Sequence, residues 1–106
     1  MKECCVFRNE KKFNWSRFER IRFYGSTFEG KRLHTWDDGS RTLYRCKDCG
    51  AYILVQESEV HMPDHTYITI IPVEDERHAE HINRTVSAYE LEMEYPGKRI
   101  NIDLGY

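Results

Sequence analysis

The stretch Cys46-Lys47-Asp48-Cys49-Gly50 lies between two apolar, aromatic runs, residues 42–45 before it and residues 51–55 after it. The two runs predict strands, so the stretch is expected at the tip of a β-hairpin. Two cysteines separated by two residues can bind one tetrahedral metal ion. The glycine that follows lets the chain adopt a left-handed backbone angle, so that backbone N–H groups can point at the sulfur atoms. The stretch therefore predicts a metal-binding turn between two strands.

This pattern of strand, Cys-x-x-Cys-Gly and strand resembles the zinc knuckle of zinc-ribbon and rubredoxin-like domains. The resemblance covers about ten of the 106 residues and implies a local structure with bound structural Zn²⁺, not a function. A redox dithiol is the alternative, but such a pair normally opens a helix, and strands flank this one. Thiols without metal are the remaining alternative.

Four ligands complete a structural zinc site, and the chain offers two further cysteines, Cys4 and Cys5. Zinc ribbons usually carry a second Cys-x-x-Cys pair, which this sequence lacks. Two ligand sets stay open. The first joins Cys46, Cys49 and either N-terminal cysteine to a histidine, and the second uses all four thiols. Bound zinc would tie the N-terminal arm to the hairpin and contribute folding free energy.

His34 is one candidate for the histidine ligand. A hairpin is expected to pair residues 32–36 with residues 41–45 around an Asp-Gly turn at residues 37–40. Its register would place His34 opposite Leu43, close to the cysteine turn. His61, which lies 12 residues after Cys49, is the other candidate.

Composition indicates one globular domain, residues 1–106, with residues 1–12 as an N-terminal arm. Hydrophobic residues make up 40% and charged residues 32% of the chain. The longest apolar run is about five residues, against the roughly 20 that span a bilayer. No apolar signal segment follows Met1, so a cytoplasmic chain with reduced thiols is the expectation.

The strand and helix signals predict an α+β fold. Residues 13–24 carry both helix and strand signals, and strand is favoured. Further strands are expected over residues 51–59, over residues 67–71 up to Pro72, and over residues 99–104. An amphipathic helix is expected over about 74–88, with acidic residues at its N-terminal end. The sum is an antiparallel sheet of about five strands with one helix on one face.

Charge is divided along the chain. Residues 1–47 carry 12 Lys/Arg and 6 Asp/Glu, whereas residues 48–106 carry 4 and 12, so the balances are +6 and −8. The basic half also holds nine of the 14 aromatic residues, a combination typical of surfaces that bind single-stranded nucleic acid. Core packing of the aromatic residues and mutual neutralisation of the two halves are the alternatives. The candidate nucleic-acid-binding residues are Trp15, Arg17, Arg20, Arg22, Tyr24, Lys31 and Arg32.

No catalytic motif is visible, so a non-catalytic interaction module is predicted, with zinc as a structural cofactor. Its partner is either a single-stranded nucleic acid at the basic half or a basic protein, for which the chain would act as an inhibitor or adaptor. A basic protein would meet the acidic half, where Glu90, Glu92 and Glu94 alternate as a ladder. No membrane partner is expected, and the oligomeric state is left open.

Overall fold

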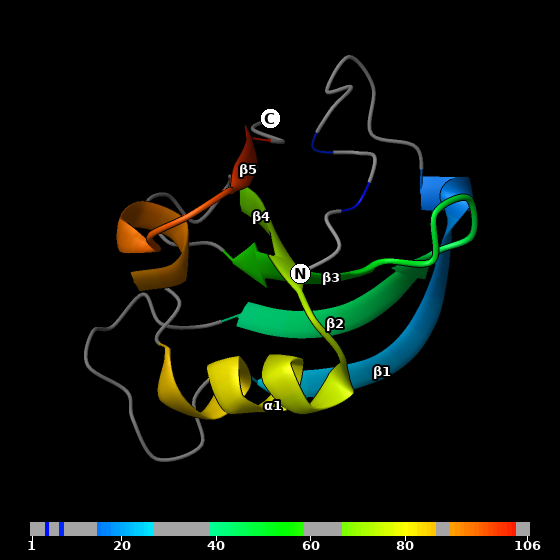
Figure 1. The fold of residues 1–106 in the computed structure, drawn as a ribbon. Coiled ribbons are helices and arrows are strands. Elements are labelled where there is room, and N and C mark those ends of the chain that lie inside the picture. Colours follow the sequence, from blue (N-terminus) through cyan, green and yellow to red (C-terminus); the bar gives the residue numbers. More distant parts are fainter. Residues whose placement is uncertain are drawn as a thin grey trace.

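A computed structural model describes residues 4, 7, 15–26, 39–58, 67–86 and 90–103 of the chain. It has five strands: β1 (Phe18–Ser26), β2 (Gly39–Cys46), β3 (Tyr52–Ser58), β4 (Tyr67–Val73) and β5 (Ile100–Asp103). They form one antiparallel sheet in the order β1-β2-β3-β4-β5, so each strand pairs with its neighbour in sequence. The helix α1 (Glu76–Thr85) lies along one face, beside β1 and β2 in Figure 1. The α+β layout with five antiparallel strands and one helix is confirmed.

The sheet has an apolar cluster on each face. Alternate residues of a strand point to opposite faces, which divides the buried side chains into two sets. The face that we call the helix face includes Leu43, Leu54 and Ile71, which pack with Ala79 and Ile82 of α1. The opposite face, called the cysteine face, carries Cys4, Phe7, Phe18, Cys46, Ala51, Ile53, Val55, Ile68 and Ile70.

Helix α1 begins later and ends earlier than predicted from the sequence. Asp75 is its N-cap, because the carboxylate accepts a 2.8 Å hydrogen bond from the backbone N–H of His78. The His78 ring in turn accepts a 3.0 Å hydrogen bond from the backbone N–H of Glu74. The chain returns to an extended conformation at Val86, so the helix covers ten residues and not 74–88.

Three other expectations for the strands are corrected. The segment 15–26 is a 3₁₀ turn (Trp15–Arg17) followed by β1, which confirms the favoured strand but not its start. Gly39 opens β2 and does not close an Asp-Gly turn. Both edges of β2 are occupied by β1 and β3, so residues 41–45 cannot also pair with residues 32–36, which lie outside the described residues.

Pro72 lies inside β4 and does not end it. It sits opposite Ile53 of β3, while β5 pairs only with residues 67–70. Among the described residues, the second half of β4 is therefore an edge on the β5 side, where a proline is tolerated.

A π-helical turn over Glu90–Glu94 precedes β5 and was not predicted from the sequence. It seats Leu91 in the cluster of the helix face. Glu92 is only 4% exposed, so the predicted acidic ladder is not a row of surface carboxylates. No helix within the described ranges is both long and apolar enough to cross a membrane.

Candidate metal centre

Three cysteine sulfur atoms converge on the cysteine face of the sheet. Cys46 is the last residue of β2, Cys49 lies in the turn before β3, and Cys4 reaches the turn from the N-terminal segment. The three sulfur atoms lie within 4.8 Å of one another, and those of Cys4 and Cys49 are 3.7 Å apart. Cys4 and Cys46 are buried and Cys49 is half-buried. None of the three forms a disulfide.

The β2–β3 hairpin presents its two cysteines through a short hydrogen-bonded turn. The backbone N–H of Gly50 donates to the carbonyl of Cys46 at 2.8 Å, and the N–H of Cys46 donates to the carbonyl of Ala51 at 2.9 Å. Gly50 has φ of +76°, the left-handed backbone that the sequence predicted there. These bonds fix the backbone positions of Cys46 and Cys49 relative to each other.

A second segment holds the cysteine turn from the side of β1. The backbone N–H of Lys47 donates to the carbonyl of Arg17 at 2.8 Å, and its ammonium donates to the carbonyl of Ser16 at 3.3 Å. The Arg17 guanidinium forms an ion pair with the Asp48 carboxylate at 2.6 Å. This ion pair is exposed, so the backbone bond is the firmer restraint.

Cys4 is fully buried, and a short turn holds it in place, because the backbone N–H of Phe7 donates to the carbonyl of Cys4 at 3.0 Å. The ring of Phe7 packs in the same cluster as Phe18 and Ala51. The N-terminal segment thus reaches the hairpin tip with one aromatic ring and one thiol.

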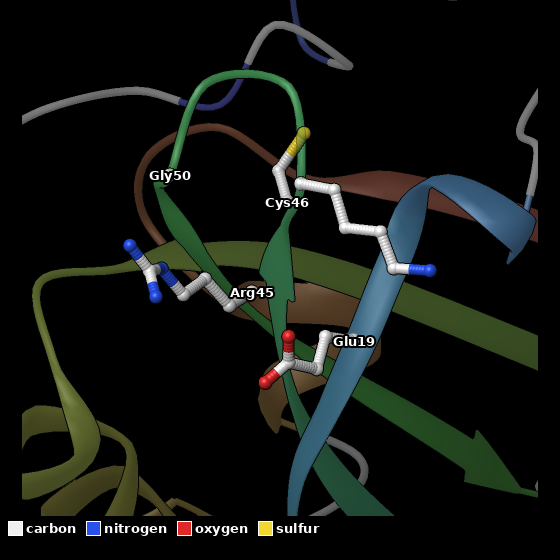
Figure 2. Close-up of a pocket in the computed structure, with 5 residues that line it drawn as sticks. Glu19, Arg45, Cys46 and Gly50 are labelled. Carbon is white, nitrogen blue, oxygen red and sulfur yellow. The ribbon is translucent and has the colours of Figure 1, made fainter.

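A hollow of about 230 Å³ lies beside the turn, lined by Glu19, Arg45, Cys46, Lys47 and Gly50. Figure 2 shows the Cys46 sulfur directed away from the carboxylate of Glu19 and the guanidinium of Arg45. Adjacent positions of β2 point to opposite faces, which explains this divergence. The charged side chains of the hollow are therefore not ligands for an ion held by the three sulfur atoms.

The predicted ligands are only partly assembled within the described residues. Cys46, Cys49 and Cys4 come together, whereas Cys5, His34 and His61 lie outside the described residues. The register that favoured His34 is wrong, since Leu43 is paired with Arg22 and Leu54.

The candidate nucleic-acid-binding residues do not share one surface. Two β-bulges in β1, at Arg20/Arg22 and at Phe23/Gly25, change which face each side chain meets. Arg22 forms a 3.6 Å ion pair with Glu76 of α1, and Tyr24 packs into the cluster of the helix face. Arg20 and Phe23 instead pair with Tyr44 and Thr42, whose side chains belong to the cysteine face.

The remaining candidate nucleic-acid-binding residues either form an ion pair or have side chains that the structure does not describe. Arg17 is held against Asp48. Trp15 lies in the 3₁₀ turn, and its side chain is not described. Lys31 and Arg32 lie outside the described residues. Both recorded ion pairs of β1 and its preceding turn join the basic half of the chain to the acidic half.

The sequence did not reveal the structural role of Arg41, which links β2 to α1. It is 0% exposed on the helix face and reaches the C-terminal end of α1. Its guanidinium donates to the carbonyls of Val86 at 2.7 Å and Ile82 at 3.3 Å, and to the side-chain oxygen of Gln56 at 3.0 Å. A cation is favourable at a helix C-terminus. An arginine alternating with Leu43 gives no sign of this burial, because exposed strand positions show the same residue type.

Comparison with known proteins gives no relative: no family model, no curated protein and no solved structure matches this chain.

Proposed function

We propose that this chain is a small, non-catalytic interaction module stapled by Zn²⁺ that Cys4, Cys46 and Cys49 bind. The observation that carries the proposal is the spacing of the three sulfur atoms. With a Zn–S bond of about 2.3 Å, two sulfur atoms on a tetrahedron lie about 3.8 Å apart. The sulfur atoms of Cys4 and Cys49 are 3.7 Å apart before any ion is placed between them.

Zinc also suits the donor set and the place of the site in the fold. Three thiolates select thiophilic ions such as Zn²⁺ over Mg²⁺ or Ca²⁺. Cys4 lies 42 residues before Cys46, so an ion bound by both would fix the N-terminal segment on the cysteine face. The role proposed for zinc is therefore structural.

Native mass spectrometry with zinc quantification tests the site. One zinc per chain is expected, and Cys46→Ser and Cys49→Ser should each abolish it. Ala51→Ser is the matched control, since it adds a hydroxyl to the same buried cluster and leaves every thiol in place. Zinc that persists in both cysteine variants would overturn the site.

The fourth ligand is found by the same measurement on single variants. Cys5→Ser, His34→Ala and His61→Ala are compared after Co²⁺ substitution, whose visible absorption reports tetrahedral thiolate coordination. The variant that lowers metal affinity and changes this spectrum identifies the ligand. Retention of the spectrum in all three would assign the fourth position to water or to an added thiol.

The partner favoured by the exposed part of β1 is a single-stranded nucleic acid. The ring of Phe23 is 54% exposed, and the Arg20 guanidinium lies 5.9 Å from its centroid. Ile21, at the bulge between Arg20 and Arg22, is also exposed. An exposed ring can stack on an unpaired base while the neighbouring cation meets a phosphate.

Fluorescence anisotropy with a labelled oligothymidylate tests this partner over a range of salt concentrations. Affinity should fall as salt rises, and Phe23→Ala and Arg20→Ala should each weaken binding. Arg77→Ala is the matched control for charge, because it removes an exposed arginine from α1. Equal losses in Arg20→Ala and Arg77→Ala would indicate a nonspecific charge effect and contradict this surface.

A further inference from the structure

We propose that the same cluster is an oxidation site, in which a peroxide joins Cys4 and Cys49 as a disulfide and displaces the bound ion. The formation of the disulfide stands on the geometry of the thiols alone, whereas the displacement of the ion rests on the proposed zinc site.

The positions of the two thiols carry the first step. Their sulfur atoms are 3.7 Å apart and must approach to about 2.05 Å to bond. Cys4 and Cys49 belong to segments far apart in sequence, so no shared turn fixes the distance between their backbones. Cys46 and Cys49, in contrast, are held within one turn by the 2.8 Å bond from the Gly50 N–H to the Cys46 carbonyl. The disulfide is therefore assigned to Cys4 and Cys49.

Burial decides which sulfur meets the oxidant. Cys4 and Cys46 are 0% and 1% exposed, whereas Cys49 is half-buried. A peroxide in solution therefore reaches Cys49 first, and the buried thiol of Cys4 lies in contact with the product. An accessible thiol beside a second cysteine is the arrangement that resolves a sulfenic acid into a disulfide.

The chemistry balances with hydrogen peroxide as the oxidant. The Cys49 thiolate attacks one peroxide oxygen, an S–O bond forms, the O–O bond breaks, and hydroxide leaves. The sulfur loses two electrons to the peroxide and becomes a sulfenic acid. The Cys4 thiolate then attacks the Cys49 sulfur, the S–S bond forms, and the S–O bond breaks. Each of the two released hydroxides takes up a proton that one of the thiols has lost, so two thiols and one peroxide give one disulfide and two waters.

Oxidation would replace the metal-mediated link between the N-terminal segment and the hairpin by a disulfide. The two bonded sulfur atoms no longer serve as thiolate ligands, which leaves Cys46 and the fourth ligand, too few donors to retain Zn²⁺. The new covalent bond still ties the N-terminal segment to the hairpin tip. Phe7 would thus stay in its cluster in both states, while the ion would be held in only one of them.

The disulfide is tested on the full chain without metal. The protein is stripped with chelator under reducing conditions, desalted, treated with one equivalent of hydrogen peroxide, alkylated and mapped by peptide mass spectrometry. A Cys4–Cys49 linkage with alkylated Cys46 is expected, together with the loss of two free thiols per chain. The same linkage should form in Cys46→Ser and in Cys5→Ser, and it should be absent in Cys49→Ser. A Cys46–Cys49 linkage, or sulfinic acid at Cys49 without a disulfide, would overturn the proposal.

A second arm repeats the oxidation on zinc-loaded protein with a chromogenic chelator present. Zinc release is expected to follow the same time course as the loss of the two thiols. Zinc that stays bound after complete Cys4–Cys49 linkage would overturn the proposed displacement of the ion. If the chain never takes up zinc but the linkage forms, the proposed function fails and the oxidation site stands. If zinc binds and no linkage forms, the proposed zinc site stands and the oxidation site fails.

Discussion

The two faces of the sheet are closed in different ways. On the helix face, α1 follows directly after β4 and is fixed at its C-terminal end by hydrogen bonds from the buried Arg41. On the cysteine face, a segment from the other end of the chain is brought in by Phe7 and three converging thiols. The helix face is covered through groups of the chain itself and requires no metal ion or other reagent. Under the two proposals made above, the cysteine face would respond to metal and oxidant through its sulfur atoms, whereas the helix face would not.

The largest expected effect comes from breaking the closure of the helix face. Arg41→Met keeps most of the side-chain volume but removes the guanidinium bonds to the carbonyls of Val86 and Ile82, the second of which still accepts from the Val86 N–H. The free energy of unfolding should fall by about 2–4 kcal/mol, the cost of losing several hydrogen bonds to a buried charged group. Urea unfolding followed by far-UV circular dichroism measures it.

Arg45→Met is the matched control for that loss. Arg45 lies two residues further along β2 on the same face of the strand but is exposed. Its substitution should change the free energy of unfolding by no more than about 0.5 kcal/mol. Equal losses in the two variants would mean that Arg41 does not hold α1 through its hydrogen bonds.

The next effect concerns the cysteine face. At free zinc one hundred times the dissociation constant, the metal should raise the free energy of unfolding by about 2.7 kcal/mol. Cys49→Ser should gain nothing from zinc under the same conditions. Urea unfolding with buffered zinc measures the gain.

The gain from zinc also tests whether the two faces are independent. Arg41→Met should gain as much from zinc as the unchanged protein, because distant sites without shared partners act additively. A much smaller gain in Arg41→Met would show that the two closures are coupled through the sheet.

A smaller effect is expected at Thr69, whose hydroxyl is fully buried on the helix face. No hydrogen bond to it is found within the described part of the chain. Thr69→Val removes the buried hydroxyl with little change in shape, so the free energy of unfolding should rise by about 1 kcal/mol. Thr42→Val, at a half-buried site on β2, is the control and should change it by less than about 0.5 kcal/mol. Destabilisation by Thr69→Val would show that the hydroxyl is in fact satisfied.

The smallest effect is a dependence on alkaline pH. Burial raises the pKa of Tyr24 above its ordinary value of 10.0, Arg22 lowers it, and Glu76 and Glu80 raise it further. In the unfolded chain this phenol loses its proton first, so stability is unchanged below about pH 10 and falls as the pH rises beyond it. Tyr24→Phe should reduce the steepness of that fall, measured by urea unfolding between pH 9 and 11.

The pKa of Tyr95 is also raised by burial, so part of the alkaline fall should remain in Tyr24→Phe. An ultraviolet titration of the phenols separates the two residues. An unchanged fall in Tyr24→Phe would contradict the role of Tyr24.

Local patterns in the sequence predicted much of the fold. Alternation and β-branched runs located β3, β4 and β5, and the acidic start of α1 was located because capping depends on neighbouring residues. Pairing partners were harder. The Asp-Gly signal before β2 suggested a hairpin with residues 32–36, although β2 lies between β1 and β3. Competition between strands is decided by the whole sheet and is not visible in a turn.

The cysteine pair of the candidate site was found from its spacing, and the count of thiols offered Cys4 and Cys5 without deciding between them. The choice of His34 rested on the mistaken strand pairing. Arg41 could not be found, because its burial depends on where α1 ends relative to β2. The division of β1 side chains between two faces was hidden for a similar reason, since a bulge leaves no mark in the alternation of residue types.

The order of the strands has a consequence for how the chain assembles during synthesis. Each strand pairs with the one made just before it, so the sheet can grow by one hairpin at a time. Cys4 is the exception: it leaves the ribosome before every strand, yet it can meet its thiol partners only after Cys49 has emerged. The thiol of Cys4 must therefore wait until the chain has grown by 45 residues to Cys49, and it stays exposed to oxidants during that interval.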